Sequence, residues 1–190
     1  MCAITGLDGL EPILEIIQLT KRIAIANKES IICGWNLLKR KLKKHKTEFI
    51  PIDSEHFSIF ELIKNDKLEN IKKIYITASG GPFLNINKSK LSRFIPKNAI
   101  KHPTWKMGKK ISIDSSTLIN KVYELIEAKK IFELDYNKFE IIIQPTSYIH
   151  GVVVFNNGFS KILSHSTSMK IPIYNSLSFN KKILKISESF

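Results

Sequence analysis

The chain has 190 residues, of which 43% are hydrophobic and 25% charged. These values are ordinary for a globular protein, and no apolar run approaches the roughly 20 residues that cross a bilayer. The formal net charge of +13 would suit a nucleic-acid-binding protein. However, the arginines are Arg22, Arg40 and Arg93, and arginine is preferred for phosphate and base contacts. Lysine, isoleucine, asparagine and phenylalanine share AT-rich codons, so genome composition explains the charge better than a nucleic-acid partner does.

Cysteine content and the N-terminal residues indicate a compartment. The sequence has two cysteines, Cys2 and Cys33, both among apolar neighbours, which disfavours a disulfide framework and fits a reducing environment. Residues 1–6 contain neither the basic stretch nor the cleavage pattern of a secretory signal. We therefore expect a cytoplasmic protein of a bacterium with an AT-rich genome, with a plastid-type organelle as the alternative.

The first 52 residues alternate strand and helix signals. Pro12 stands where a first helical turn tolerates proline, and the apolar residues after it recur with helical spacing. A largely apolar run over 22–26 is typical of a strand covered on both faces. Alternating strands and helices with short connections predict a parallel α/β sheet. The predicted strands are 3–6, 22–26 and 48–52, and the predicted helices are 12–19 and 29–44.

From Asp53 onward the pattern becomes mixed. Residues 79–107 carry three prolines and lack a sustained period, so they are predicted as a long loop with a short helix near 88–94. Loops of this length are commonly functional lids. The turn sequence Asn156-Asn157-Gly158 between two apolar runs predicts a β-hairpin. The other predicted elements are a helix over 56–63 and strands over 72–77, 139–143, 152–155 and 160–163, with no closing element over 176–190.

One long amphipathic helix is predicted over 114–132. Asp114, Ser115, Ser116 and Thr117 supply the side chains that cap a helix N-terminus. Ser115 and Ser116 would then also occupy a position suited to an anion, although plain capping explains them equally well. The side of this helix that we expect to be buried carries Leu118, Ile119, Val122, Leu125 and Ile126.

Two acidic pairings offer ligands for a hard cation. Asp53 and Glu55 lie two residues apart at a predicted strand end, so their carboxylates can share one face, and Mg²⁺ or Mn²⁺ prefers oxygen ligands. The alternative is a polar strand terminus that caps the next helix. On the long helix, Asn120, Lys121 and Glu124 share one side because residues three and four apart are neighbours. Glu124 could complete a metal site, or the three could form a solvated face with a routine ion pair.

Ser79-Gly80-Gly81 directly follows a predicted strand. Backbone N–H groups of such a turn could cradle a phosphate, with the Ser79 hydroxyl as a further donor. A turn that needs positive φ angles is the alternative. Further along, His102, Trp105 and Met107 place a histidine, an indole and a thioether in a polar loop, as in a lid that closes over a flat ligand. His56, His150 and His165 lack metal-type spacing, and we expect them to be structural or surface residues.

In this order, the motifs resemble those of the 1-deoxy-D-xylulose 5-phosphate reductoisomerase family, along nearly the whole chain. The number of ordered matches makes the resemblance specific. The matching strings are Ala26-Asn27-Lys28-Glu29-Ser30, Pro51-Ile52-Asp53-Ser54-Glu55-His56, Ser79-Gly80-Gly81-Pro82-Phe83, His102-Pro103-x-Trp105-x-Met107-Gly108-x-Lys110-Ile111-Ser112 and Asp114-Ser115-x-Thr117-x-x-Asn120-Lys121-x-x-Glu124.

The resemblance implies a role for each matching position. It implies an enzyme that isomerises 1-deoxy-D-xylulose 5-phosphate and reduces it to 2-C-methyl-D-erythritol 4-phosphate with NADPH and Mg²⁺ or Mn²⁺. The catalytic group would comprise Lys28, Asp53, Glu55, Glu124 and His102. The metal ligands among them would be Asp53, Glu55 and Glu124. Substrate contacts would be Ser54, Ser79, His102, Trp105, Ser115, Asn120 and Lys121, and cofactor contacts would be Asn27, Lys28, Glu29 and Met107.

The implied fold is α/β: a partial parallel Rossmann-like sheet followed by an α+β catalytic domain. Residues 1–53 would be the C-terminal half of the NADPH-binding domain, and residues 54–190 the catalytic domain, with the lid over about 79–109. A homodimer is expected, with no membrane association. The family's glycine-rich dinucleotide motif and C-terminal helical domain have no counterpart here, and Gln144 stands where the family usually has histidine. An inactive remnant of the enzyme is therefore the alternative, and a basic nucleic-acid-binding module ranks third.

Overall fold

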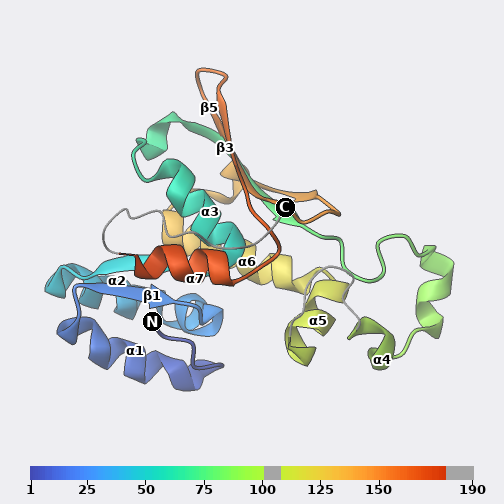
Figure 1. The fold of residues 1–190 in the computed structure, drawn as a ribbon, viewed down its shortest axis with the longest axis horizontal. Helices are drawn as coiled ribbons and strands as arrows, with labels where there is room; N and C mark the ends of the chain where they lie inside the picture. The colour runs from blue at the N-terminus through green and yellow to red at the C-terminus, as the bar shows by residue number, and fades with distance from the viewer. Residues whose placement is uncertain (101–107, 179–190) are drawn as a thin grey trace.

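The computed structural model describes residues 1–100 and 108–178. An N-terminal portion with a two-stranded parallel sheet lies below a portion with a four-stranded mixed sheet (Figure 1). The N-terminal elements are η1 (Leu7–Gly9), α1 (Leu10–Ile16), η2 (Ile17–Leu19), β1 (Arg22–Ile25), α2 (Lys28–His45) and β2 (Glu48–Pro51). The elements that follow are α3 (Ser54–Ile63), η3 (Leu68–Asn70), β3 (Ile71–Ala78), η4 (Lys88–Arg93), α4 (Pro96–Ala99), α5 (Lys109–Ser116), α6 (Ile119–Phe132), η5 (Tyr136–Lys138), β4 (Phe139–Ile143), β5 (Ile149–Phe155), β6 (Ser160–Ser164) and α7 (Lys170–Leu177).

The N-terminal portion confirms the predicted strand–helix–strand unit. Strands β1 and β2 pair in parallel, with Ile23 opposite Phe49. Helix α2 covers them through Ile31 and Leu38, which are fully buried. The predicted strand over 3–6 is wrong, because only Cys2 forms a bridge, to Ile25. The Asn27 side chain binds the carbonyls of Ile4 and Gly6, so those groups are engaged by a side chain instead of a neighbouring strand.

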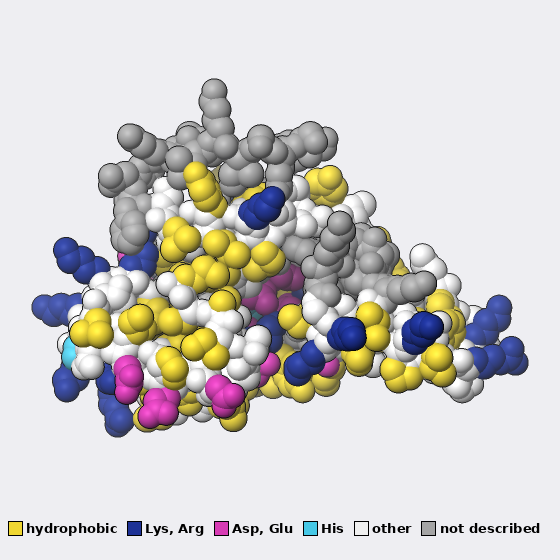
Figure 2. All heavy atoms as spheres, turned by 60° about the horizontal axis from the view of Figure 1, so that its bottom comes forward, with side chains coloured by type: hydrophobic (Ala, Val, Ile, Leu, Met, Phe, Trp, Pro, Cys, Tyr) yellow, Lys and Arg dark blue, Asp and Glu magenta, His cyan; other side chains and the backbone are white. Residues whose placement is uncertain are grey.

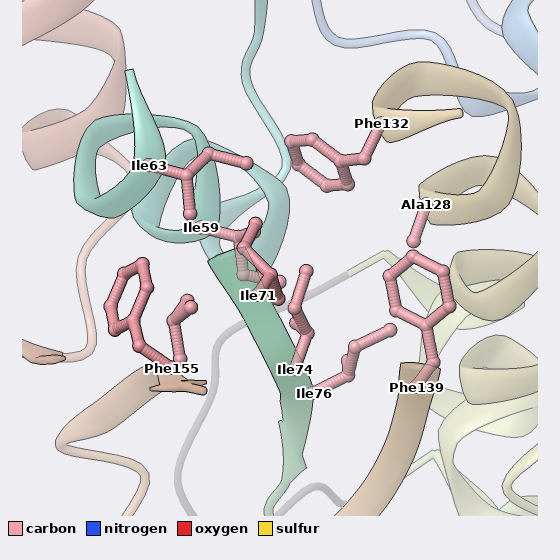
Figure 3. Close-up of a cluster of buried hydrophobic side chains, with 10 residues drawn as sticks. Ile59, Ile63, Ile71, Ile74, Ile76, Ala128, Phe132, Phe139 and Phe155 are labelled. Atoms are coloured by element: carbon pink, nitrogen blue, oxygen red, sulfur yellow. The ribbon is translucent and has the colours of Figure 1, made fainter. Parts of the chain in front are cut away.

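The larger sheet has the strand order β4-β3-β5-β6. Strand β3 pairs in parallel with β4 and antiparallel with β5, and β5 and β6 form the predicted hairpin. Ile74 and Ile76 of β3 lie in an apolar cluster with Ile59 of α3 and Ala128 and Phe132 of α6 (Figure 3). These side chains alternate with more exposed ones along β3, as expected for a strand covered on one face. The mixed α/β architecture therefore agrees with the predicted fold class.

The helix predicted over 114–132 is confirmed from Ile119 to Phe132, but its predicted start is wrong, because the structure has two helices there. Helix α5 ends at Ser116, Leu118 adopts a left-handed conformation with φ of 60°, and α6 begins at Ile119. Asp114 lies in the last turn of α5, where its carboxylate pairs with Lys110 at 2.9 Å. The residues expected to cap a helix N-terminus therefore lie at a helix C-terminus. Local capping propensity cannot distinguish these positions, because the same short polar side chains also favour turns.

Two other features of the structure were not predicted. Helix α7, whose short sequence contains Pro172, was not predicted. This proline lies in the first turn of the helix, where a backbone N–H has no helical acceptor, so its missing N–H costs no hydrogen bond. Cys33 is exposed despite its apolar sequence neighbours.

The loop predicted over 79–107 contains η4 near the expected helix and also α4. Within residues 1–100 and 108–178, none of the helices combines the length and the hydropathy that crossing a membrane requires.

Candidate metal and substrate site

A cavity of about 300 Å³ lies where the two portions meet. Its lining combines the N-terminus of α2, the N-terminus of α3, the C-terminal end of β3, and α6. Figure 2 shows acidic side chains inside a hollow of the surface, with a basic side chain beside them. The lining includes Lys28, Asp53, Ser54, Glu55, Ser79, Ser115, Asn120, Lys121 and Glu124. All of these residues were predicted as site residues.

Three carboxylates converge in this cavity. Asp53 caps the N-terminus of α3, where its Oδ1 accepts a hydrogen bond from the Glu55 backbone N–H at 3.3 Å. Glu55 occupies the first turn of α3, and Glu124 reaches them from α6. One oxygen of each carboxylate lies within 4.8 Å of the others. The capping and the metal-site explanations for Asp53 are therefore compatible, since one carboxylate can serve both.

Two lysines insert between the carboxylates. Lys28 Nζ lies 3.1 Å from Asp53 Oδ2 and 3.6 Å from Glu124 Oε1. Lys121 Nζ lies 2.6 Å from Glu124 Oε2 and also pairs with Glu55 Oε1. Glu124 is only 1% exposed and Lys121 only 8%. The ammonium groups thus occupy an arrangement of carboxylate oxygens that a metal cation could also bind.

The buried charges shift one another's pKa values. Burial alone would lower the pKa of Lys28, but the carboxylates of Asp53 and Glu124 outweigh it and raise the pKa. Burial alone would raise the pKa of Asp53, but Lys28 above all holds that pKa well below its usual range. Burial, followed by repulsion from Glu55, raises the pKa of Glu124 to about 8. At neutral pH Glu124 therefore holds a proton, which a bound metal cation would have to displace.

A buried histidine lies behind the three carboxylates and connects α3 to α6. His56 is fully buried, and its Nε2–H can donate to the Glu124 backbone carbonyl at 2.9 Å. Its Nδ1 lies 3.5 Å from Asp53 Oδ1 and 3.4 Å from Glu127 Oε2. Burial raises the pKa of Glu127 to about 7. Partners of this kind orient the ligands of a metal site. We expected His56 to be a structural or surface residue, and its structural role here is to support the side chains of the candidate site.

The polar side of α6 is its buried side. Lys121, Glu124 and Glu127 are buried, while Ile119 is 37% and Val122 45% exposed. The prediction that the apolar side faces inward is therefore wrong for the first half of this helix. Charged residues are almost never buried unless they are paired, and here Lys121 lies 2.6 Å from Glu124, while Glu127 lies 3.4 Å from the His56 ring.

The glycine turn after β3 approaches the end of α5. Gly80 and Gly81 have φ angles of 91° and 69°, which favour glycine. A Cβ on Gly81 would lie 2.8 Å from the Ser115 carbonyl oxygen, so the close contact requires glycine. The Gly81 N–H also lies 3.4 Å from Ser79 Oγ. The turn brings the Ser79 and Ser115 hydroxyls to one cavity, although Ser115 does not lie at a helix N-terminus as expected.

Asn120 and Ser54, two further predicted substrate contacts, also line the cavity. Asn120 accepts a hydrogen bond from Lys28 Nζ at 2.9 Å and donates one to Glu124. Ser54 donates to Glu55 Oε2 at 2.6 Å. These bonds fix the rotamers of the carboxylates and the amide. Such side chains can later exchange one partner for a substrate oxygen without moving far.

Of the three predicted cofactor contacts that the structure describes, Lys28 lines the cavity, whereas Asn27 and Glu29 do not. Asn27 caps α2, accepting from the Ser30 N–H at 2.6 Å, and Glu29 lies 3.8 Å from Lys110 Nζ. His102, Trp105 and Met107 fall outside the described residues.

Several cavity residues were not predicted. They include Gln144, Ser147, His150 and Met169, from the segments around β5 and before α7. We expected His150 to be structural, yet it contributes to the lining. Gln144 stood out in the sequence only as a position where the resembled family usually has histidine, and the topology of the sheet brings the other three here. Glu127 did carry a signal, since it follows Glu124 by three residues on the same helix side.

Two models of a single family match the chain. Residues 1–34 match the model of 1-deoxy-D-xylulose 5-phosphate reductoisomerase, and residues 49–132 match that of the enzyme's C-terminal domain. The reductoisomerase of Pelagibacter ubique is 63% identical over 95% of this chain and 46% of its own length. That of Wolbachia pipientis from Culex pipiens is 49% identical over 95% of this chain and 46% of its own length. The chain therefore spans about half the length of the curated relatives that it matches.

Solved structures of reductoisomerases have the same fold. The Zymomonas mobilis enzyme in complex with NADPH superimposes with a TM-score of 0.90 and 37% identity, over 100% of this chain and 49% of its own. A reductoisomerase in complex with NADPH, fosmidomycin and magnesium gives a TM-score of 0.86 and 37% identity, over 94% of this chain and 46% of its own. The motifs, the family models and the fold agree, and this chain belongs to the 1-deoxy-D-xylulose 5-phosphate reductoisomerase family.

Proposed function

We propose that Asp53, Glu55 and Glu124 bind one Mg²⁺ or Mn²⁺ ion. The observation that carries this proposal is the convergence of three carboxylate oxygens within 4.8 Å of one another in a cavity. Hard divalent cations prefer such oxygen ligands. A divalent cation bound here would displace the proton that Glu124 holds at neutral pH. A similar structure is known in complex with magnesium.

The same cavity has donors for a phosphate group. We assign the Ser79 and Ser115 hydroxyls, Asn120 and Lys121 to the phosphate of a sugar phosphate. Gly81 lies against both Ser79 Oγ and the Ser115 backbone, and all four residues line the same cavity. Ser54, which adjoins the metal ligand Glu55, would contact the rest of the sugar together with His102 and Trp105 of the predicted lid.

The reaction that these groups support is the NADPH-dependent isomerisation and reduction of 1-deoxy-D-xylulose 5-phosphate to 2-C-methyl-D-erythritol 4-phosphate. A bound divalent cation stabilises negative charge on substrate oxygens as a Lewis acid. Lys28 places an ammonium group beside Asp53 and Glu124, where it can donate to a substrate oxygen. On this proposal Asn27, Lys28, Glu29 and Met107 face the nicotinamide cofactor, and the lid excludes water from the reacting sugar.

Several broader assignments accompany this function. Residues 1–53 would serve the cofactor and residues 54–190 the metal and the sugar phosphate. The active form would be a homodimer in a bacterial cytoplasm. Light scattering of the purified chain tests the dimer, since a monomeric mass at micromolar concentration would contradict it.

The test of function is NADPH oxidation by the purified full chain with 1-deoxy-D-xylulose 5-phosphate and Mn²⁺, followed by absorbance. We expect oxidation that requires both substrate and metal. Substrate binding without oxidation would favour the inactive remnant instead. No binding of the sugar phosphate in the presence of Mn²⁺ would overturn the proposal.

Matched variants separate the site from general damage. Glu124→Gln removes one proposed metal ligand, while Glu133→Gln removes a carboxylate at the exposed end of the same helix, where it pairs with Lys39. The first change should abolish metal-dependent binding of the sugar phosphate, and the second should preserve it. Equal behaviour of the two variants would contradict the assigned site.

A further inference from the structure

His150 and His165 form a buried stacked pair beside the proposed site. Their ring centroids lie 3.6 Å apart, with an interplanar angle of 10°. His150 is 2% exposed and His165 6% exposed. His150 lines the metal and substrate cavity, whereas His165 faces a separate groove behind it. Any influence of His165 on the cavity would therefore pass through the His150 ring.

The pairing of β5 with β6 is irregular at His150. The ladder between β5 and β6 is regular from Gly151 onward and shifts its register between Ile149 and Gly151. His150 lies at this irregularity, where a bulge can direct a side chain toward a site. The backbone N–H of His165 bonds to the Tyr148 carbonyl at 3.0 Å, which holds the residue after β6 against the strand that carries His150.

Hydrogen bonds select one tautomer of each ring. His150 Nε2 lies 3.2 Å from the His165 carbonyl oxygen, and His165 Nδ1 lies 2.7 Å from the Ser166 carbonyl oxygen. A carbonyl oxygen only accepts hydrogen bonds, so His150 Nε2 and His165 Nδ1 must each carry a proton. In the neutral rings the lone pairs are then on His150 Nδ1 and His165 Nε2. Burial and then the neighbouring His165 lower the pKa of His150 to about 4, which agrees with a neutral ring.

We propose that His165 is a positioning residue for the substrate cavity, because its ring and its carbonyl fix the plane and the tautomer of His150. This inference rests on the proposed function, since it assigns His150 to the binding of the sugar phosphate. A ring held in one plane presents the same nitrogen to each substrate molecule. Side chains that orient a functional group in this way affect affinity without touching the ligand.

Two variants of similar size isolate the contribution of the flat ring. His165→Phe retains an aromatic ring for stacking, whereas His165→Leu fills the space without one, and both keep the backbone carbonyl. We expect His165→Leu to weaken binding of 1-deoxy-D-xylulose 5-phosphate about tenfold in the presence of Mn²⁺, and His165→Phe to retain the parent affinity. In a His150→Ala background, His165→Leu should cause no further loss.

Ring-nitrogen NMR of the metal-free full chain gives a second readout. His150 should show one neutral tautomer protonated at Nε2 in the parent and in His165→Phe, and a mixture of tautomers in His165→Leu. An unchanged tautomer and affinity in a folded His165→Leu protein would overturn the inference. If the parent bound no sugar phosphate but the tautomer still responded to His165→Leu, the proposed function would fail while the orientation of His150 by His165 would stand.

Discussion

Helix α6 contributes to two buried regions that differ completely in chemistry. Its C-terminal half places Ala128 and Phe132 in the apolar cluster around β3. Its N-terminal half places Lys121, Glu124 and Glu127 in the charged cluster behind the cavity. Apolar burial is favourable for each side chain by itself, whereas a buried charge is tolerated only with a partner of opposite charge. The first region should therefore account for stability and the second for binding.

The comparison explains why the charged cluster can persist. Its carboxylates and lysines are paired at distances of 2.6 to 3.6 Å, and replacing such a pair by apolar residues is often neutral or stabilising. The cluster is thus a poor means of stabilising the fold. On the proposed function, metal and phosphate binding are the reasons for its charges.

The largest expected effect is in the apolar region. Phe132→Ala should lower the free energy of unfolding by about 3–5 kcal/mol, because it leaves a cavity among the side chains around β3. Val122→Ala on the exposed side of the same helix should change it by less than about 0.5 kcal/mol. Urea denaturation of both variants measures the difference, and equal losses would mean that the apolar cluster does not dominate stability.

In the charged region, Glu124→Gln should greatly weaken metal binding but hardly change stability. Mn²⁺ affinity should fall by more than about 100-fold, since even partners outside the ligand shell cost roughly 10- to 100-fold. The free energy of unfolding of the metal-free protein should change little, because Lys121 keeps Glu55 and Lys28 keeps Asp53 as partners. Calorimetric titration with Mn²⁺ and urea denaturation measure the two quantities.

The matched control for that prediction is Glu133→Gln. Glu133 follows the last turn of α6 and pairs with Lys39 at the surface. The Glu133→Gln substitution should leave the affinity for Mn²⁺ at the parent value. A large loss of stability in metal-free Glu124→Gln, with Mn²⁺ binding retained, would assign the cluster to the fold instead of to the metal.

The sequence predicted the two regions unequally. The strands over 22–26, 72–77 and 139–143 were found from their apolar runs, because apolar burial follows local pattern. The candidate metal ligands, which the structure brings together, were proposed from motif order, although hydrophobic periodicity gave the wrong buried side for α6. That rule fails when charges are buried by mutual pairing over long sequence separations, such as Lys28 with Glu124. The break at Leu118 was also missed, because the contact between Gly81 and Ser115 is tertiary.

The pH dependence of metal binding sharpens the comparison further. Burial and Glu55 raise the pKa of Glu124 to about 8, so at neutral pH this carboxyl holds a proton that a metal must displace. Affinity for Mn²⁺ should therefore increase with pH, by up to about tenfold per pH unit below pH 8, and level off above it. Asp53 has a lowered pKa and stays ionised, so it adds no dependence. Titrations from pH 6 to 9 measure the slope, and a flat profile would contradict it.

The smallest effect is expected for an ion pair outside the cluster. Lys39 and Glu133 pair between α2 and the end of α6, but their side chains are 54% and 50% exposed. A double-mutant cycle with Lys39→Gln and Glu133→Gln should give a coupling of at most about 1 kcal/mol, reduced by added salt.

The Lys121–Glu124 pair contains the same two chemical groups at 10% and 2% side-chain exposure. A cycle there should give a larger coupling that salt hardly changes and that Mn²⁺ alters, since the metal competes with Lys121 for the carboxylate. If the two cycles agreed in size and salt dependence, burial would not be what distinguishes the charged cluster from the surface.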